Sequence, residues 1–315
     1  MNTKSPITVS GARYIKLGEK GKWEDLCFEE GTLRLGFDEA PHDAALQGDK
    51  KSIADVFYKA GYIQKTASNF ARQVLDFYDP DPDLLWVTFS KGCLWWCKAK
   101  PEVEYFGSEE EGPLGSRLRK TQEGWRNTDI NGCALRISDL SGHLTRVAGY
   151  RSTICDIGGK ALDYLVRKIN GQHLPEVHAA MEAHEHMQKS LAQLIKLLTW
   201  QDFELFVELV FSQSGWQRIS AIGDTQKTVD LELVQPLTKE KAVVQIKAQT
   251  DQAQLDSYLD SLAAYGAHRC FYVFHSTDQA LNIRNRNNIM LMDVNALAQS
   301  ALRSGLAEWL IKKVG

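Results

Sequence analysis

Residues 229–250 read VDLELVQPLTKEKAVVQIKAQT, and this stretch decides the fold of the C-terminal part of the chain. Successive side chains of an extended strand point to opposite faces, so Asp230 and Glu232 share one face. By the same rule, Gln245 and Lys247 share one face of the following strand. The turn QPLTKE between the two runs predicts an antiparallel pair. We therefore expect an acid, an amide and a lysine on one surface.

The segments on either side of this hairpin have the patterns of helices and buried strands. A capping-type helix start at Thr199 precedes an apolar stripe at helical spacing, made of Phe203, Phe206, Val207, Val210 and Phe211. After the hairpin come a helical run at 252–266 and apolar strands at 270–274 and 289–293. A helix, antiparallel strands and alternating helices and strands predict an α/β sandwich with a mixed sheet.

The polar face of the hairpin has the residue types that phosphodiester hydrolysis requires. A hard divalent cation held by carboxylate and carbonyl oxygens neutralises the phosphate and lowers the pKa of an attacking water. A nearby ammonium group such as that of Lys247 orients that water or stabilises developing charge. Asp230 and the oxygen of Gln245 are candidate metal ligands. Gln245 brings no charge, so a second carboxylate is needed: Glu204 is the first candidate, and Glu208 is the alternative.

These residues resemble the Mrr-type branch of the PD-(D/E)xK nuclease superfamily. The resemblance rests on Asp202-Phe203-Glu204 in the helix, Gly215-Trp216 at its end, Asp230, and Gln245-x-Lys247. In that branch Gln commonly replaces the acidic residue before x-Lys. One position departs from the family, because Val229 stands where members usually have Gly.

The resemblance covers the chain from residue 199 to about residue 300 and implies a fold, an activity and ligands. The fold is a restriction-endonuclease-like α/β/α sandwich. The activity is cleavage of DNA that depends on Mg²⁺, with Mn²⁺ as a substitute, in an enzyme that is often a homodimer. By position, Asp230, Gln245 and Glu204 bind the metal, and Lys247 assists the water.

We expect three parts in the chain: a recognition domain at 1–155, a helical connector at 156–198 and the nuclease domain at 199–315. The first part is α+β and rich in aromatic residues, with a hairpin of strands 84–90 and 93–99 joined by Lys91-Gly92. The connector contains a heptad-spaced seam, which fits either packing on its own domains or a dimer or spacer helix. The seam residues are Val177, Ala180, His184, Met187, Leu191, Leu194 and Leu198.

Charge counts place the expected DNA affinity in the N-terminal part. Residues 196–315 hold 12 basic and 13 acidic groups, whereas residues 113–151 hold seven basic groups and three acidic ones. Neutralisation of phosphates supplies most of the affinity for DNA. The sequence therefore predicts phosphate contacts from the basic segment, with these candidates: Arg117, Arg119, Lys120 and Arg126.

Tryptophans near this segment are candidates for stacking on unpaired bases. They are Trp95, Trp96 and Trp125. A tryptophan-rich domain joined to a nuclease resembles the PUA-like readers of modified bases, which have a β-barrel. The alternative is that these side chains fill the core of the domain.

Composition limits the remaining classes of function. The 315 residues have 43% hydrophobic and 24% charged residues and a net charge of −3, as in ordinary globular proteins. No apolar run approaches the roughly 18–20 residues that span a bilayer, and the start lacks a secretory signal. We expect a cytoplasmic protein with no organic cofactor: a DNA endonuclease of defence against foreign DNA, with modified DNA among its expected targets. The alternatives are a repair or recombination nuclease on branched DNA, and a catalytically silent module that binds DNA or a partner.

Overall fold

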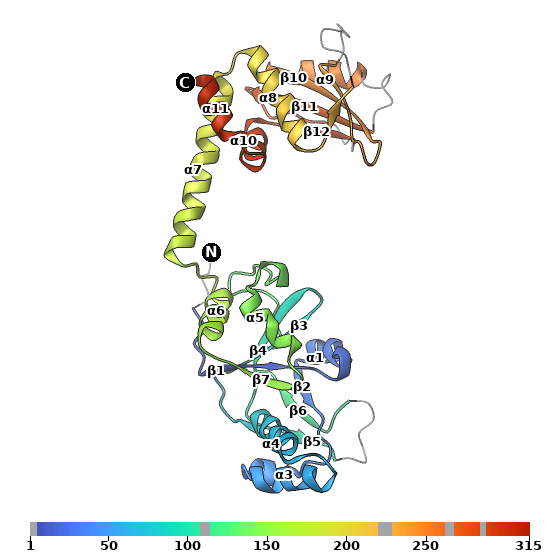
Figure 1. The fold of residues 1–315 in the computed structure, drawn as a ribbon, viewed down its shortest axis with the longest axis vertical. Coiled ribbons are helices and arrows are strands. Elements are labelled where there is room, and N and C mark those ends of the chain that lie inside the picture. The colour runs from blue at the N-terminus through green and yellow to red at the C-terminus, as the bar shows by residue number, and fades with distance from the viewer. Residues whose placement is uncertain (1–4, 108–113, 220–228, 262–267, 284–287) are drawn as a thin grey trace. The chain divides into compact units, whose positions relative to one another are not determined.

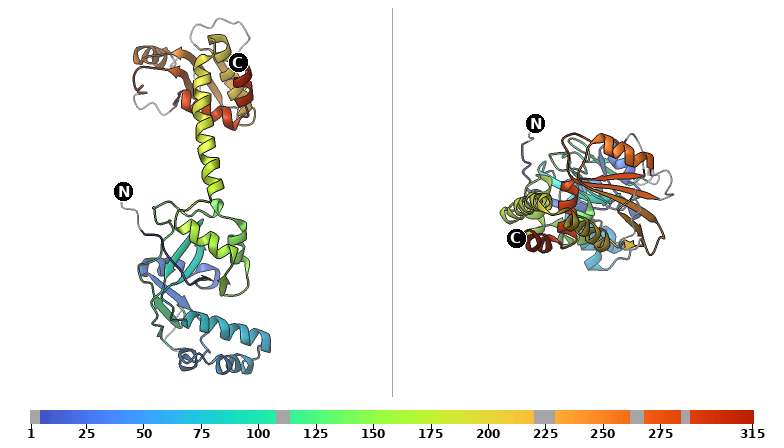
Figure 2. Two further views of the ribbon diagram at one scale, coloured as in Figure 1. Left: turned by 90° about the vertical axis from the view of Figure 1, so that its left-hand side faces the viewer. Right: turned by 90° about the horizontal axis from the view of Figure 1, so that it is seen from above.

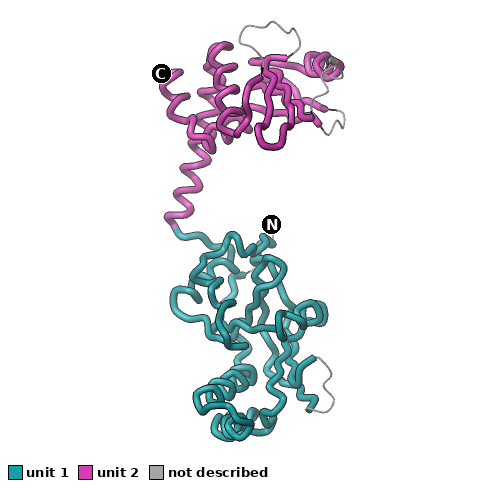
Figure 3. The backbone as a smooth tube through the Cα atoms, turned by 45° about the vertical axis from the view of Figure 1, so that its right-hand side comes forward, with its two compact units in different colours: residues 1–174 teal, residues 175–315 magenta. Residues whose placement is uncertain are grey.

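The computed structural model of the protein describes residues 5–107, 114–219, 229–261, 268–283 and 288–315. The chain divides into two compact units, residues 1–174 and 175–315, which are shown in different colours in Figure 3. Within the described ranges, no helix is both long enough and apolar enough to cross a membrane. Each unit has its own sheets and its own core, so each is described by itself.

Unit 2 is built around one five-stranded sheet with the order β12-β11-β10-β9-β8. Strands β10, β11 and β12 are parallel, while β9 and β8 run antiparallel to their neighbours. The elements are α7 (Pro175–Leu197), α8 (Trp200–Gln213), β8 (Gln217–Arg218), β9 (Leu231–Val234), β10 (Lys241–Gln249), α9 (Gln252–Ser261), β11 (Arg269–Ser276), β12 (Ile289–Met292), α10 (Val294–Arg303) and α11 (Ala307–Val314). The rest of the helix predicted to residue 266 lies outside the described residues.

Helices cover both faces of this sheet. Apolar side chains such as Leu231, Val244 and Phe271 pack against α7, α8, α10 and α11 in one core. On the opposite face, side chains such as Val243 and Tyr272 pack against α9 in a second core. Figures 1 and 2 show this layering from three directions. The α/β/α sandwich with a mixed sheet that the sequence predicts is confirmed for this unit.

The stretch expected to be a connector is divided between the two units. Helix α6 (Lys160–Ile169) buries Leu165 and Ile169 in the core of unit 1. In α7, Leu191 and its seam neighbours Leu194 and Leu198 pack in the core of unit 2. The first four seam residues are exposed: Val177, Ala180, His184 and Met187. Only the second half of the heptad seam therefore packs within its own unit.

Unit 1 contains two open sheets, with the orders β4-β3-β1-β7 and β2-β6-β5. Its strands are β1 (Gly11–Ile15), β2 (Thr32–Leu35), β3 (Leu84–Ser90), β4 (Cys93–Lys98), β5 (Glu104–Tyr105), β6 (Arg117–Lys120) and β7 (Ile154–Ile157). Besides α6, its α-helices are α1 (Glu24–Glu30), α2 (His42–Leu46), α3 (Lys50–Lys59), α4 (Gln64–Tyr78) and α5 (Gly142–Thr145). The short 3-10 helices are η1 (Glu19–Gly21), η2 (Ile137–Asp139) and η3 (Arg146–Gly149). The described strands close no barrel, so the PUA-like barrel is not confirmed.

The predicted hairpin of unit 1 forms with the expected turn. Ser90 pairs with Cys93, and the two loop residues between them, Lys91 and Gly92, have φ of 50° and 75°. This pair of left-handed residues matches the right-handed twist of the flanking strands, and Gly adopts it without a steric cost. The hairpin therefore follows directly from the Lys-Gly dipeptide.

Strand β6 buries two arginine side chains in unit 1, and Arg117 is fully buried. Its guanidinium group donates to the carbonyls of Gly36 and Phe37 at 3.1 and 3.0 Å, and also to the carbonyl of Ala40. Its Nε donates to the hydroxyl of Tyr78 at 3.1 Å. Arg117 thus ties the loop after β2 to the second sheet.

We expect Arg117→Ala to destabilise unit 1 rather than only to remove a surface charge. Each buried carbonyl left without a donor costs about 1–3 kcal/mol, so the loss should be about 3–5 kcal/mol of unfolding free energy. That corresponds to roughly 10 °C in the melting temperature of a unit this size, measured by differential scanning calorimetry. The control is Lys120→Ala, which changes an exposed cation on the same strand. Equal melting of the two variants would contradict the buried role.

Candidate active site

The hairpin of β9 and β10 brings Asp230 and Gln245 into direct contact. Leu231 pairs with Val244 and Glu232 with Val243, so the polar residues of both strands share one face as the alternation predicts. The Asp230 carboxylate accepts hydrogen bonds from Gln245 Nε2 at 2.5 Å and from the Ile246 backbone N–H at 2.6 Å. Gln245 itself is buried. One hydrogen bond thus joins the acid to the amide, and a second holds the acid to the backbone of β10.

Lys247 lies two residues further along β10, on the same face as Gln245. Burial raises the pKa of Asp230, whereas the Ile246 N–H and the charge of Lys247 act in the opposite direction. The ammonium group is therefore close enough to Asp230 to stabilise its ionised form. The three residues that the sequence places on one surface do lie together.

Glu204, on α8, is the carboxylate that interacts electrostatically with Asp230. Helix α8 begins at Thr199, whose side chain caps the N–H of Asp202 at 3.2 Å, and its apolar stripe packs in the core of the sheet. The pKa of Glu204 is raised, first by burial and then by the charge of Asp230, while Arg218 and Lys247 oppose this. Within the described residues, Glu204 has no hydrogen-bond or ion-pair partner.

Glu208, the alternative acid, has a structural partner. Its carboxylate accepts a hydrogen bond from Arg218 at 2.8 Å. An ion pair between a helix and the strand that follows it is an ordinary stabilising contact. The geometry therefore favours Glu204 as the second acid of the site, and it adds Arg218, which sequence reasoning did not consider.

The donor chemistry of this group fits a hard divalent cation. Asp230 and Glu204 are partly buried carboxylates, each with its pKa raised by burial, and the charge of Asp230 raises that of Glu204 further. Gln245 donates its NH₂ to Asp230, which leaves its carbonyl oxygen as a possible ligand. No cluster of three or more His, Cys, Asp or Glu side chains suited to a metal occurs in the described ranges. A cation here would have two carboxylates and an amide, as suits Mg²⁺ that keeps several waters.

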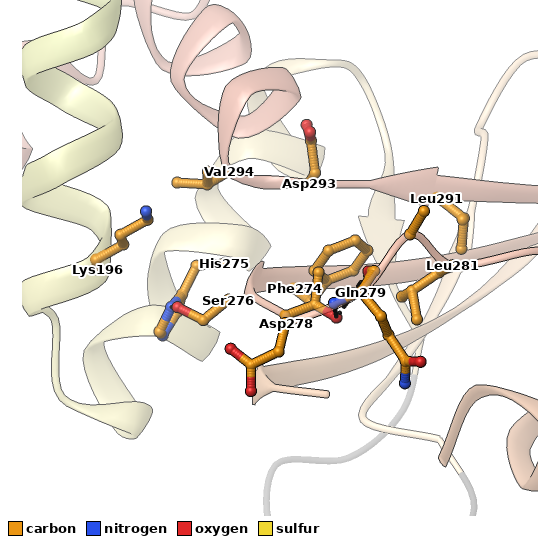
Figure 4. Close-up of a pocket in the computed structure, with 12 residues that line it drawn as sticks. Lys196, Phe274, His275, Ser276, Asp278, Gln279, Leu281, Leu291, Asp293 and Val294 are labelled. Carbon is orange, nitrogen blue, oxygen red and sulfur yellow. Dashed lines mark hydrogen bonds between the residues drawn. The ribbon is translucent and has the colours of Figure 1, made fainter. Parts of the chain in front are cut away.

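A pocket of about 730 Å³ opens at the carboxyl ends of the parallel strands (Figure 4). It lies where the parallel strands β11 and β12 end, and its lining includes Lys196, His275, Asp278 and Asp293. Phe274, which also lines it, pairs with Lys247 on the neighbouring strand. The pocket is thus close to the Asp230 group and could receive part of a substrate bound there.

His275 joins this pocket to the helix that carries Glu204. Its ring packs edge-on against Phe203, with ring centroids 4.8 Å apart. Burial lowers the pKa of His275, and the charge of Lys196 lowers it further. The imidazole is therefore favoured in its neutral form, which leaves Lys196 as a cation of the pocket lining.

Two of the four cations expected to contact DNA are buried, and this corrects the prediction. Arg117 is tied to the backbone of unit 1, as described above. Arg119 donates to the carbonyls of Lys100 and Phe77 at 2.8 and 2.9 Å, and burial lowers its pKa to about 10. The charge count did not distinguish these side chains from surface cations. Neither guanidinium group can reach a phosphate in this structure.

The other two of the four candidate cations, Lys120 and Arg126, lie at the surface, and each forms an ion pair with a glutamate. Lys120 contacts Glu104 at 2.9 Å, and Arg126 contacts Glu123 at 2.5 Å. Arg126 also lies over the ring of Trp96, 5.5 Å from its centroid. These two cations remain accessible to DNA, but each has an acidic neighbour that reduces its attraction for a phosphate.

The three candidate stacking tryptophans are part of the core of unit 1. Trp96 and Trp125 are buried, and their indole N–H groups donate to the carbonyls of Thr128 and Thr32, both at 2.8 Å. Trp95 is half-buried and stacks on Phe28 with ring centroids 4.0 Å apart. Because both faces of the first sheet are covered, Trp95 and Trp96 pack in cores on opposite sides. Base stacking by these side chains is therefore not supported.

The α/β/α sandwich of unit 2, with its mixed sheet, is the fold of the restriction-endonuclease-like class. The comparison with protein families gives the same result: residues 195–301 match the model of the Mrr-type restriction endonuclease catalytic domain. The C-terminal unit therefore contains an Mrr-type nuclease domain. No curated protein and no solved structure matches the chain.

The raised pKa of Glu204 gives a prediction about stability. Because the folded pKa lies above the ordinary value near 4.3, an ionised Glu204 destabilises the folded unit at neutral pH. The wild type therefore gains stability as the pH falls through the folded pKa. In metal-free buffer, Glu204→Gln should melt at a higher temperature than the wild type at pH 7.5, and this difference should shrink toward pH 4.

The matched control is Glu208→Gln, which removes one acid of the same helix that is paired with Arg218. It should show no such pH-dependent gain. Melting curves of the three proteins, recorded between pH 4 and pH 8, provide the measurement. A Glu204→Gln variant that is less stable than the wild type at pH 7.5 would show that this carboxylate is not under electrostatic strain.

Proposed function

We propose that the protein is a divalent-metal-dependent DNA endonuclease in which Asp230, Glu204, Gln245 and Lys247 form the active site. The observation that carries the proposal is the contact of Asp230 with Gln245 beside Lys247, in a domain of the nuclease class. Glu204 supplies the second negative charge. Mg²⁺ is the expected cation, and Mn²⁺ is its expected substitute.

Each side chain has one role in this proposal. Asp230 and Glu204 supply charged oxygens, and the Gln245 carbonyl supplies a neutral one, held in place by its own amide hydrogen bond to Asp230. A bound divalent cation supplies charge neutralisation at the phosphate and a more acidic water. Lys247 orients the attacking water and stabilises the charge that develops on the phosphate. Lys196, in the neighbouring pocket, can contact a phosphate further along the substrate.

We infer the biological role from the Mrr-type family of the C-terminal domain. Mrr-type domains suggest a cytoplasmic restriction enzyme that acts in defence against foreign DNA, with modified DNA as one possible target. The near-neutral charge of residues 196–315 supports a division of labour in which unit 1 supplies part of the DNA affinity. A role in repair or recombination on branched DNA would use the same chemistry, so comparison of branched, modified and unmodified substrates separates these functions.

We predict that Asp230→Asn and Lys247→Ala each lower nicking of supercoiled plasmid DNA in Mg²⁺ by about a hundredfold or more. Both side chains lie on the polar strand face, so the fold should be kept. Lys241→Ala is the matched control, because it removes an exposed lysine from the same strand and should leave nicking unchanged. If the wild type binds DNA but does not nick it in Mg²⁺ or Mn²⁺, the domain is a silent binding module and the proposal is wrong.

The proposal includes a homodimer, which the exposed half of the α7 seam could support. Val177, Ala180, His184 and Met187 continue the seam that packs in unit 2. Sedimentation velocity of the full chain should then give twice the mass of one chain. Val177→Lys together with Met187→Lys should give monomers, because charges at seam positions disrupt a two-helix interface. Ala179→Lys, off the seam, is the control; a monomeric wild type would exclude the dimer.

A further inference from the structure

Two adjoining pockets of unit 1 combine aromatic walls with cations. The first, of about 450 Å³, is lined by Trp23, Phe37, Lys16 and Lys20 among others. The second, of about 380 Å³, includes Phe70, Lys65 and Arg151. Thr153 lines both pockets, and the rings of Phe37 and Phe70 lie 5.2 Å apart, centroid to centroid. We call the two pockets together the Thr153 groove.

The groove carries an excess of positive charge. Lys16, Lys20, Lys65 and Arg151 line it, against one acid, Glu19. None of these four cations forms an ion pair with a carboxylate in the described part of the chain, and Lys20, Lys65 and Arg151 are exposed. These cations differ in this respect from Lys120 and Arg126, whose charges are offset by acidic neighbours. Unpaired cations around a hollow form an electrostatic site for a polyanion.

The backbone around the first pocket is held in a conformation that costs energy. Four described residues other than glycine have positive φ, and two of them, Lys20 at 53° and Phe37 at 65°, line this pocket. A left-handed conformation costs a residue with a side chain roughly 1–2 kcal/mol. For Phe37 the conformation is maintained by Arg117, which donates to the Phe37 carbonyl. Strain of this kind is often found at binding sites, and here it occurs at two residues that line the pocket.

We propose that the Thr153 groove binds an unpaired segment of a DNA strand, with phosphates at Lys65 and Arg151 and a base beside the half-buried rings of Phe37 and Phe70. Aromatic walls next to unpaired cations match what a single strand offers, namely base faces and phosphates that are both accessible. A volume of about 450 Å³ lies within the range of ligand pockets, about 300–1,000 Å³. The choice of DNA rather than RNA rests on the nuclease function proposed above.

The test measures binding and needs no catalysis. Fluorescence anisotropy with the full-length Asp230→Asn chain compares a paired duplex with the same duplex carrying a gap of unpaired nucleotides. Without further changes, the chain should bind the gapped DNA at least several times more tightly. Equal affinity for the two DNAs would overturn the assignment to an unpaired segment.

Charge removal tests the groove itself. Lys65→Ala with Arg151→Ala should weaken binding of the gapped DNA by about ten- to a hundredfold at 0.1 M salt. The slope of log affinity against log salt should become smaller by about 1.4, since each single-strand phosphate contact contributes about 0.7. Lys20→Gly should also weaken binding while it relieves backbone strain, so misfolding cannot explain its effect.

The matched control removes two exposed lysines of the same unit outside the groove, in Lys50→Ala with Lys51→Ala. Its affinity should change less than threefold. If the control and the groove variants weaken binding equally, or if neither does, the groove proposal is wrong. Plasmid nicking by the chain with Asp230 intact reports separately on the proposed nuclease function. Failure of the groove proposal can therefore be distinguished from failure of the proposed nuclease function.

Discussion

The hydrogen bond from the Ile246 backbone N–H to the Asp230 carboxylate connects the fold of unit 2 to its chemistry. It attaches the residue before β9 to the middle of β10, where Gln245 and Lys247 stand on either side. A slip of the hairpin by one residue would turn Gln245 and Lys247 to the opposite face and remove the site. Buried Leu231 and Val244 oppose that slip because they pack against α8 and its neighbours. The apolar face thus determines the position of the polar one.

The same packing explains why Glu204 is strained. Helix α8 is held against the sheet by Phe203, Phe206 and Phe211, and this places Glu204 near Asp230 without a cation of its own. Two partly buried carboxylates whose pKa values stay raised despite the nearby charges of Lys247 and Arg218 are unfavourable for a protein that needs stability alone. A divalent cation would relieve this repulsion. Metal binding by Asp230 and Glu204 would therefore explain why the folded state tolerates their unfavourable electrostatic energy.

Strand alternation was enough to predict the β9–β10 hairpin and the shared face of Asp230, Gln245 and Lys247, because a period of two assigns every side chain to a face. The hydrogen bond between Asp230 and Gln245 is seen only in the structure. Helical spacing likewise predicted α8 and hence Glu204. The charge count failed for Arg117 and Arg119, because their burial depends on carbonyls of residues 36–40, 77 and 100, which are distant in sequence. The Thr153 groove was missed for a related reason. Its cations come from three separate segments, and only the short run KLGEKGK at 16–22, which contains Lys16 and Lys20, gives any local signal.

If Asp230 and its neighbours form a divalent-cation site, the full chain should bind such a cation directly. Free Mn²⁺ can be followed by electron paramagnetic resonance as the full chain is added, for the wild type and for Asp230→Asn. We predict that the wild type binds Mn²⁺, that Mg²⁺ displaces it, and that Asp230→Asn binds it at least tenfold more weakly. Equal Mn²⁺ binding by the two proteins would contradict this prediction.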